Sequence, residues 1–141
     1  MLDFNLVGPA LVLGIACMGS CVGCGIAGLA SHAAMSRVEE GHGKFIAMAA
    51  APSSQIIYGF IMMLFLARAV TGGTLSPISA IAFGVGSGGA FMFSAIFQGM
   101  VCAAGIQATA RQPAVFGKCF AAIGIIESFA LFAFVFPLLI I

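Results

Sequence analysis

One carboxylate in this chain lies inside a long apolar stretch, which makes it the residue best placed to do chemistry. Glu127 lies in the run 119–141, which contains no other charged residue. The remaining charged residues lie at the N-terminus or in short connecting segments: Asp3, Arg37, Glu39, Glu40, Lys44, Arg68, Arg111 and Lys118. Placing a carboxylate at the middle of a bilayer costs about 2.5–3.5 kcal/mol. A residue kept at that cost usually carries an ion or a proton.

Two glutamines lie at a similar depth in other apolar segments. Counted at about 1.5 Å per residue from the nearest charged connecting segment, Gln55, Gln98 and Glu127 lie about 16, 20 and 14 Å into the membrane. Ser54 precedes Gln55 directly. Pro52 has no backbone N–H and disturbs the hydrogen bonds one turn earlier, which leaves a carbonyl oxygen nearby for other partners. These groups are therefore expected to meet at one level.

A carboxylate, two amide oxygens, a hydroxyl and a carbonyl form a set of hard oxygen ligands. Such a set suits a dehydrated Na⁺ as well as a proton. A proton needs only the carboxylate, so the extra oxygens favour a metal cation. For each glutamine the alternative is an interhelical hydrogen bond that only joins helices. Three polar residues at one depth favour an ion site. Tyr58 is expected to donate a hydrogen bond from its hydroxyl to Glu127 rather than to bind the ion.

The composition requires a membrane environment for the whole chain. Of its 141 residues 62% are hydrophobic and only 6% charged, with a mean hydropathy of +1.23, whereas soluble domains carry about 25% charged residues. A net charge of +1 gives no basic patch for nucleic acid. The acidic start and the long apolar run after it indicate a retained first helix rather than a signal peptide. Gly43-Lys44-Phe45 lacks the glycine spacing and the hydroxyl of an ATP-binding loop, so we expect no catalytic site and no cofactor.

The apolar segments predict four membrane-spanning helices arranged as a duplication. A span needs about 20 apolar residues, and four such runs occur at about 6–34, 45–66, 77–110 and 119–141. A shift of 74 residues aligns Arg37 with Arg111 and Gly43-Lys44 with Gly117-Lys118. We therefore expect one all-α membrane domain, 1–141, of two tandem helical hairpins, 6–66 and 77–141. On this register Glu127 aligns with Ser53, so only the second hairpin carries the carboxylate.

The first and third spans differ in bulk from the second and fourth. Small residues let helix backbones approach closely in lipid, and they recur every four residues at Ala16, Ser20, Cys24 and Gly28, and at Gly86, Ala90 and Ser94. Two thin and two thick helices give the subunit the shape of a wedge, and several wedge-shaped copies can close into a ring. The alternative is that the small residues only allow tight packing within a four-helix monomer. The basic residues of the connecting segments 36–44 and 111–118 predict that both are cytoplasmic and that both termini lie outside.

At these residues the sequence resembles the membrane-rotor proteolipid, known as K or c, of V-type (vacuolar/archaeal-type) rotary ATPases and ATP synthases in their bacterial form. The segment 51–60, Phe97-Gln98-Gly99 and residues 127–130 resemble the second-, third- and fourth-helix motifs of the Na⁺-binding members. Ser54 stands where those members have threonine, and Ile56 replaces a small residue. The resemblance leaves Na⁺ and H⁺ both open. It implies an ion site formed by the Glu127 carboxylate, Gln55, Gln98, the Ser54 hydroxyl and the Ala51 carbonyl, with Tyr58 holding the carboxylate.

The resemblance also implies partners and a location. Identical subunits would form a ring in a bacterial plasma membrane, surrounded by lipid. An arginine of a stator membrane protein would displace the ion from Glu127, and the segments 36–44 and 111–118 would contact the central stalk. Rotation would be coupled to ATP turnover in another sector of the complex.

Two other functions compete with a rotor subunit. A small proton-coupled multidrug transporter also has four helices and one membrane glutamate, but it carries that glutamate in its first helix, with tryptophan lining the substrate pocket. This chain has no tryptophan, and its glutamate lies in the fourth span. A purely structural membrane proteolipid is the third possibility, and Glu127 with its two glutamines argues against it.

Overall fold

The chain folds into long helices joined by short connections. The computed structural model describes residues 4–141, so Asp3 lies outside the described residues. The helices are α1 (Val7–Met35), α2 (His42–Ala50), α3 (Ser54–Thr71), α4 (Pro77–Arg111) and α5 (Phe116–Leu138). Two 3₁₀ turns, η1 (Ala51–Ser53) and η2 (Pro113–Val115), lie between them. The expected all-α fold is confirmed.

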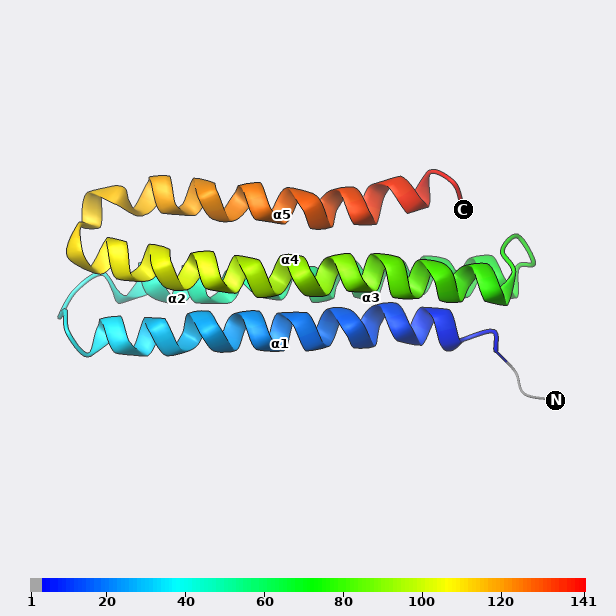
Figure 1. Cartoon of the computed structure of the whole chain (residues 1–141), viewed down its shortest axis with the longest axis horizontal. Helices are drawn as coiled ribbons and strands as arrows, with labels where there is room; N and C mark the ends of the chain where they lie inside the picture. Colours follow the sequence, from blue (N-terminus) through cyan, green and yellow to red (C-terminus); the bar gives the residue numbers. More distant parts are fainter. Residues whose placement is uncertain (1–3) are drawn as a thin grey trace.

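Within residues 4–141, four helical rods are long and apolar enough to cross a membrane: Val7–Met35, His42–Thr71, Pro77–Arg111 and Pro113–Leu138. The second rod is α2, η1 and α3 in succession, drawn behind α4 in Figure 1. Its helical residues extend beyond the apolar run 45–66 at both ends, because hydropathy marks the lipid-covered part whereas backbone hydrogen bonds continue into the polar region. The chain is thus an integral membrane protein.

The rods run alternately up and down. The α1–α2 and α4–α5 connections lie at one end of the bundle, and the α3–α4 turn lies at the other end with the C-terminus (Figure 1). Gly73 adopts a positive φ of 76° in the α3–α4 turn, a conformation that favours glycine. Ser76 then caps α4 by accepting a hydrogen bond from the Ser79 backbone N–H at 3.1 Å, and Pro77 starts the helix. The segments 36–44 and 111–118 accordingly share one end.

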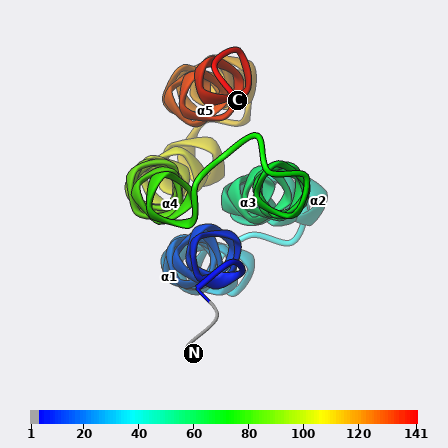
Figure 2. The ribbon, with the colours of Figure 1, turned by 90° about the vertical axis from the view of Figure 1, so that its right-hand side faces the viewer.

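α1 and α4 pack backbone against backbone, and Figure 2 shows them side by side in the end view. A Cβ atom on Gly99 would collide with the backbone of Gly23, and one on Gly84 with the backbone of Gly8. This close approach is what small residues allow in a membrane. Part of the expected stripe is uncovered, however: a Cβ atom on Gly28 or Gly86 would meet nothing within 4 Å.

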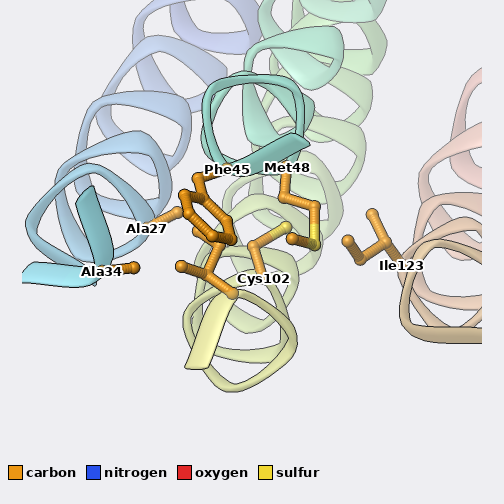
Figure 3. Packing of buried hydrophobic residues seen from close by; sticks show 7 residues of the cluster. Ala27, Ala34, Phe45, Met48, Cys102 and Ile123 are labelled. Carbon is orange, nitrogen blue, oxygen red and sulfur yellow. The ribbon is translucent and has the colours of Figure 1, made fainter. Parts of the chain in front are cut away.

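Two apolar clusters fill the bundle, one toward each end. Figure 3 shows the cluster nearer the α1–α2 connection, where Phe45, Met48, Cys102 and Ile123 converge from α2, α4 and α5. The other cluster consists of Val12, Ala16, Met62, Leu66, Phe91 and Ala130. α5 contributes only Ile123 and Ala130 to the buried residues, so it is the most exposed rod. The polar side chains lie between the two clusters.

Candidate functional site

The site begins at the irregular turn within the second rod. Pro52 cannot donate a backbone hydrogen bond, and the chain tightens there from α-helix to the 3₁₀ turn η1. The Ser54 backbone N–H consequently donates to the Ala51 carbonyl three residues back. The same carbonyl oxygen lies 3.1 Å from the Ser54 hydroxyl. The turn therefore brings a carbonyl and a hydroxyl together at the level of Gln55.

Gln55 and Gln98 join this turn to α4. The Ser54 hydroxyl lies 3.2 Å from Gln55 Oε1, so its single proton can serve either that oxygen or the Ala51 carbonyl. Gln55 Nε2 donates to Gln98 Oε1 at 3.0 Å and to Ser94 Oγ at 3.3 Å. Both glutamines are 0% exposed. Buried amides of this kind must be hydrogen-bonded to be tolerated.

The carboxylate of Glu127 completes the network from α5. Tyr58 Oη donates to Glu127 Oε1 at 2.8 Å, and Gln98 Nε2 lies 3.5 Å from Oε2. The Tyr58 ring stacks on Phe134 with centroids 5.7 Å apart and contacts Phe91 at 6.3 Å. These aromatic contacts fix the direction of the hydroxyl, so Tyr58 holds one carboxylate oxygen while Gln98 approaches the other.

The polar network also attaches α5 to the bundle. Gln98 Nε2 donates to the Ile123 carbonyl at 3.2 Å, and Ser94 Oγ donates to the Ile126 carbonyl at 3.1 Å. Interhelical hydrogen bonds in membranes contribute about 0.6 kcal/mol each on average and up to about 1.7. Because α5 buries few apolar side chains, these bonds are a substantial part of what positions Glu127.

All six residues singled out from the sequence meet in this network: Ala51, Ser54, Gln55, Tyr58, Gln98 and Glu127. Ser53 does not join it, since its hydroxyl donates to the Ala50 carbonyl at 2.7 Å. Ser94 is a member that sequence reasoning missed. Ser94 lies four residues before Gln98 and so shares a helix face with it, but its spacing also fits the stripe of small residues.

The carboxylate lies where the bundle interior meets its outer surface. Glu127 and Tyr58 are half-buried, whereas Ile125 and Phe129 on α5 are 66% and 64% exposed. The carboxylate is therefore partly exposed on the outside of the single bundle. The neighbouring groups present carbonyl, hydroxyl and amide oxygens, the ligands that hard cations prefer. The chemistry of these groups suits a hard cation such as Na⁺ and equally allows a proton on the carboxylate.

Comparison with known proteins gives the family. The model of the family of the ATP synthase C subunits matches residues 7–66 and 81–140. The two matches are offset by 74 residues at both ends, the same shift that aligns the sequence with itself, which confirms the tandem duplication.

Two curated relatives extend the match. Over 120 residues the chain is 36% identical to the "A-type ATP synthase subunit K" of Methanocaldococcus jannaschii, covering 83% of this chain and 52% of that protein. Over 129 residues it is 35% identical to the "V-type sodium ATPase subunit K" of Enterococcus hirae, covering 88% of this chain and 81% of that protein. The chain spans about half the length of the first of these relatives. It belongs to the family of the ATP synthase C subunits, in the duplicated form of the V-type c/K proteolipids.

Proposed function

We propose that this protein is the ion-carrying component of the rotor ring of a V-type ATPase or ATP synthase. In this proposal Glu127 carries Na⁺, with H⁺ as the alternative, while ring rotation is coupled to ATP turnover in the soluble sector. The observation that carries the proposal is the half-buried carboxylate of Glu127, held by Tyr58 at 2.8 Å beside the buried amides of Gln55 and Gln98. The family assignment leaves the multidrug-transporter alternative without support.

The oxygen-rich neighbourhood supports Na⁺ as the cargo. An amide presents an acceptor oxygen on one side and a donor nitrogen on the other, so half a turn of the Gln98 amide replaces the nitrogen facing Glu127 with an oxygen. The Gln55 amide, whose nitrogen donates to Gln98 Oε1, must turn with it. The ligands would then be the carboxylate of Glu127, the amide oxygens of Gln55 and Gln98, the Ser54 hydroxyl and the Ala51 carbonyl. The E. hirae relative is by its name part of a sodium ATPase, which points in the same direction.

Cargo binding changes the cost of moving Glu127 past lipid. An ionised carboxylate is costly in hydrocarbon, and a bound Na⁺ or proton removes its net charge. The loaded protomer is then able to face lipid, whereas the unloaded one is stabilised beside a cation. An arginine of a stator membrane protein would supply that cation and release the ion.

Ring assembly accounts for surfaces that a single copy leaves uncovered. The open space beside Gly28 and Gly86 allows a neighbouring copy to approach α1 and α4 closely. At the end of the bundle with the α1–α2 connection, Lys44 Nζ lies 5.6 Å from the centroid of the Phe116 ring. This contact joins the segments 36–44 and 111–118 into one surface, which in this proposal faces the cytoplasm of a bacterial cell and contacts the central stalk, with both termini outside.

Labelling with a hydrophobic carbodiimide tests the proposal. The reagent attacks protonated carboxyl groups in lipid, so the purified protein is treated at several pH values with and without Na⁺ and the adduct is mapped by mass spectrometry. Labelling of Glu127 that Na⁺ suppresses and K⁺ does not is the expected result. Labelling that ignores Na⁺ would favour H⁺ as cargo. An unlabelled Glu127 at every pH would refute the ion-carrying role.

A further inference from the structure

Arg68 is the one charged residue at its end of the bundle within residues 4–141. It lies in the last turn of α3, close to the α3–α4 turn, and its side chain is exposed. The two acidic residues of the connecting segments, Glu39 and Glu40, lie at the opposite end, and Glu127 lies between the two apolar clusters. Within residues 4–141, therefore, no acidic side chain lies at the end of the bundle that carries Arg68.

An apolar groove leads away from Arg68 along the outer face of α3. Its volume is about 510 Å³, and it is lined by Ile61, Leu64, Phe65, Ala67, Arg68 and Thr71. Leu64 and Phe65 are each 46% exposed. Residues 61, 64, 65 and 68 follow one another at helical spacing, and at 1.5 Å per residue the stripe extends about 10 Å from Arg68 toward the middle of the rod.

The charge of Arg68 decides which partner fits this groove. A phospholipid offers an acyl chain for the groove and a phosphate for the guanidinium, which binds phosphate through paired hydrogen bonds. A zwitterionic lipid carries its own cation, whereas an anionic lipid leaves its charge for Arg68.

We propose that the groove of α3 binds an acyl chain of an anionic phospholipid whose phosphate is held by Arg68. The site is separate from the cation network, since neither Arg68 nor the groove residues contribute a hydrogen bond to it. The proposal requires only that the protein is in a membrane, so it stands or falls independently of the identity of the transported ion.

Photolabelling with lipids of defined headgroup tests this site. The full-length protein is reconstituted into phosphatidylcholine vesicles that contain a trace of phosphatidylglycerol or phosphatidylcholine with a photoreactive acyl chain. Adducts on Ile61, Leu64 and Phe65 are quantified by mass spectrometry. With the phosphatidylglycerol probe Arg68→Gln should lower their yield about fivefold, since one basic residue at an anionic membrane surface contributes about 1 kcal/mol. Arg37→Gln, at the opposite end of the bundle, should leave this yield unchanged.

The same experiment can overturn the proposal in several ways. An unchanged adduct yield in Arg68→Gln would show that the guanidinium does not hold the headgroup. Equal labelling of the wild-type groove by both probes would exclude a preference for anionic lipid. Absence of adducts from both probes would show that protein, such as a second copy, covers this face. Circular dichroism of both variants checks that they fold like the wild type, as expected for exposed side chains.

Discussion

Replacing Tyr58 with phenylalanine removes one hydroxyl from Glu127 and leaves the ring contacts in place. The hydroxyl donates to Glu127 Oε1 at 2.8 Å, whereas the ring is fixed by Phe91 and Phe134. A hydrogen bond to a charged group contributes about 1.5–3 kcal/mol, against about 0.5–1.5 for a neutral pair. The bond therefore stabilises the ionised, Na⁺-bound carboxylate more than the protonated one, by about 1–1.5 kcal/mol.

That difference predicts a measurable shift in the competition between Na⁺ and H⁺. A free-energy change of about 1.4 kcal/mol is a factor of about ten in an equilibrium constant. At one fixed pH, the Na⁺ concentration that halves carbodiimide labelling of Glu127 should therefore rise about tenfold in Tyr58→Phe. The assay is a Na⁺ titration of the labelling rate in purified protein, with ionic strength held constant by a salt of a larger cation.

Ser128→Ala provides the matched control for this experiment. Ser128 is adjacent to Glu127, but its hydroxyl donates to the Ile125 carbonyl of its own helix at 2.7 Å. Its removal should leave the Na⁺ titration unchanged. The reasoning would be refuted if Tyr58→Phe and wild type were half-protected at the same Na⁺ concentration, or if Ser128→Ala shifted the titration as far as Tyr58→Phe.

Two further substitution pairs separate neighbouring roles. Ser54→Ala removes a proposed ligand oxygen and should weaken the protection of Glu127 by Na⁺ about tenfold, about 1.4 kcal/mol, without slowing labelling in the absence of Na⁺. Ser53→Ala is the control and should match the wild type, because the Ser53 hydroxyl donates to the Ala50 carbonyl. Equal effects of the two substitutions would show that Ser54 is not a ligand. Gly99→Ala places a methyl group against the backbone of Gly23 and should destabilise the protein by about 1–3 kcal/mol, measured by thermal unfolding. Gly117→Ala is the control and should not destabilise the protein, because a Cβ atom there would meet nothing within 4 Å. Equal melting temperatures of the two variants would contradict the close packing of α1 against α4.

Most residues of the site can be predicted from the sequence, because a polar or charged side chain costs free energy inside a lipid bilayer. In lipid, a charged or amide side chain is retained only with a partner or a role, so Glu127, Gln55 and Gln98 were conspicuous. Helical rise then converts residue number into depth, and the structure places the three within one hydrogen-bond network. The cost of polarity and the helical rise do not tell whether a serine hydroxyl belongs to a binding site or to a packing surface. Ser94 looked like a packing residue because serine serves both purposes in membrane helices.

The sequence predicts where the helices lie more readily than it predicts which of their residues touch. The four-residue spacing identified small residues on α1 and α4, but glycines occur on several faces of both helices. Periodicity therefore could not tell that Gly23 and Gly99 touch while Gly28 and Gly86 meet open space. Pro52 predicts an irregularity in the helix but not the 3₁₀ turn at Ala51–Ser53. Proline removes one hydrogen-bond donor without determining which carbonyl the N–H groups of its neighbours then use.

Direct binding of radioactive sodium tests whether Glu127 and its oxygen neighbours hold a cation. Equilibrium dialysis of the purified protein should give one bound Na⁺ per chain in the wild type. Glu127→Gln removes the charge but keeps a side chain of the same shape that can still hydrogen-bond to Tyr58, so it should fold and bind none. Absence of Na⁺ binding by the wild type, or equal binding by Glu127→Gln, would contradict the account.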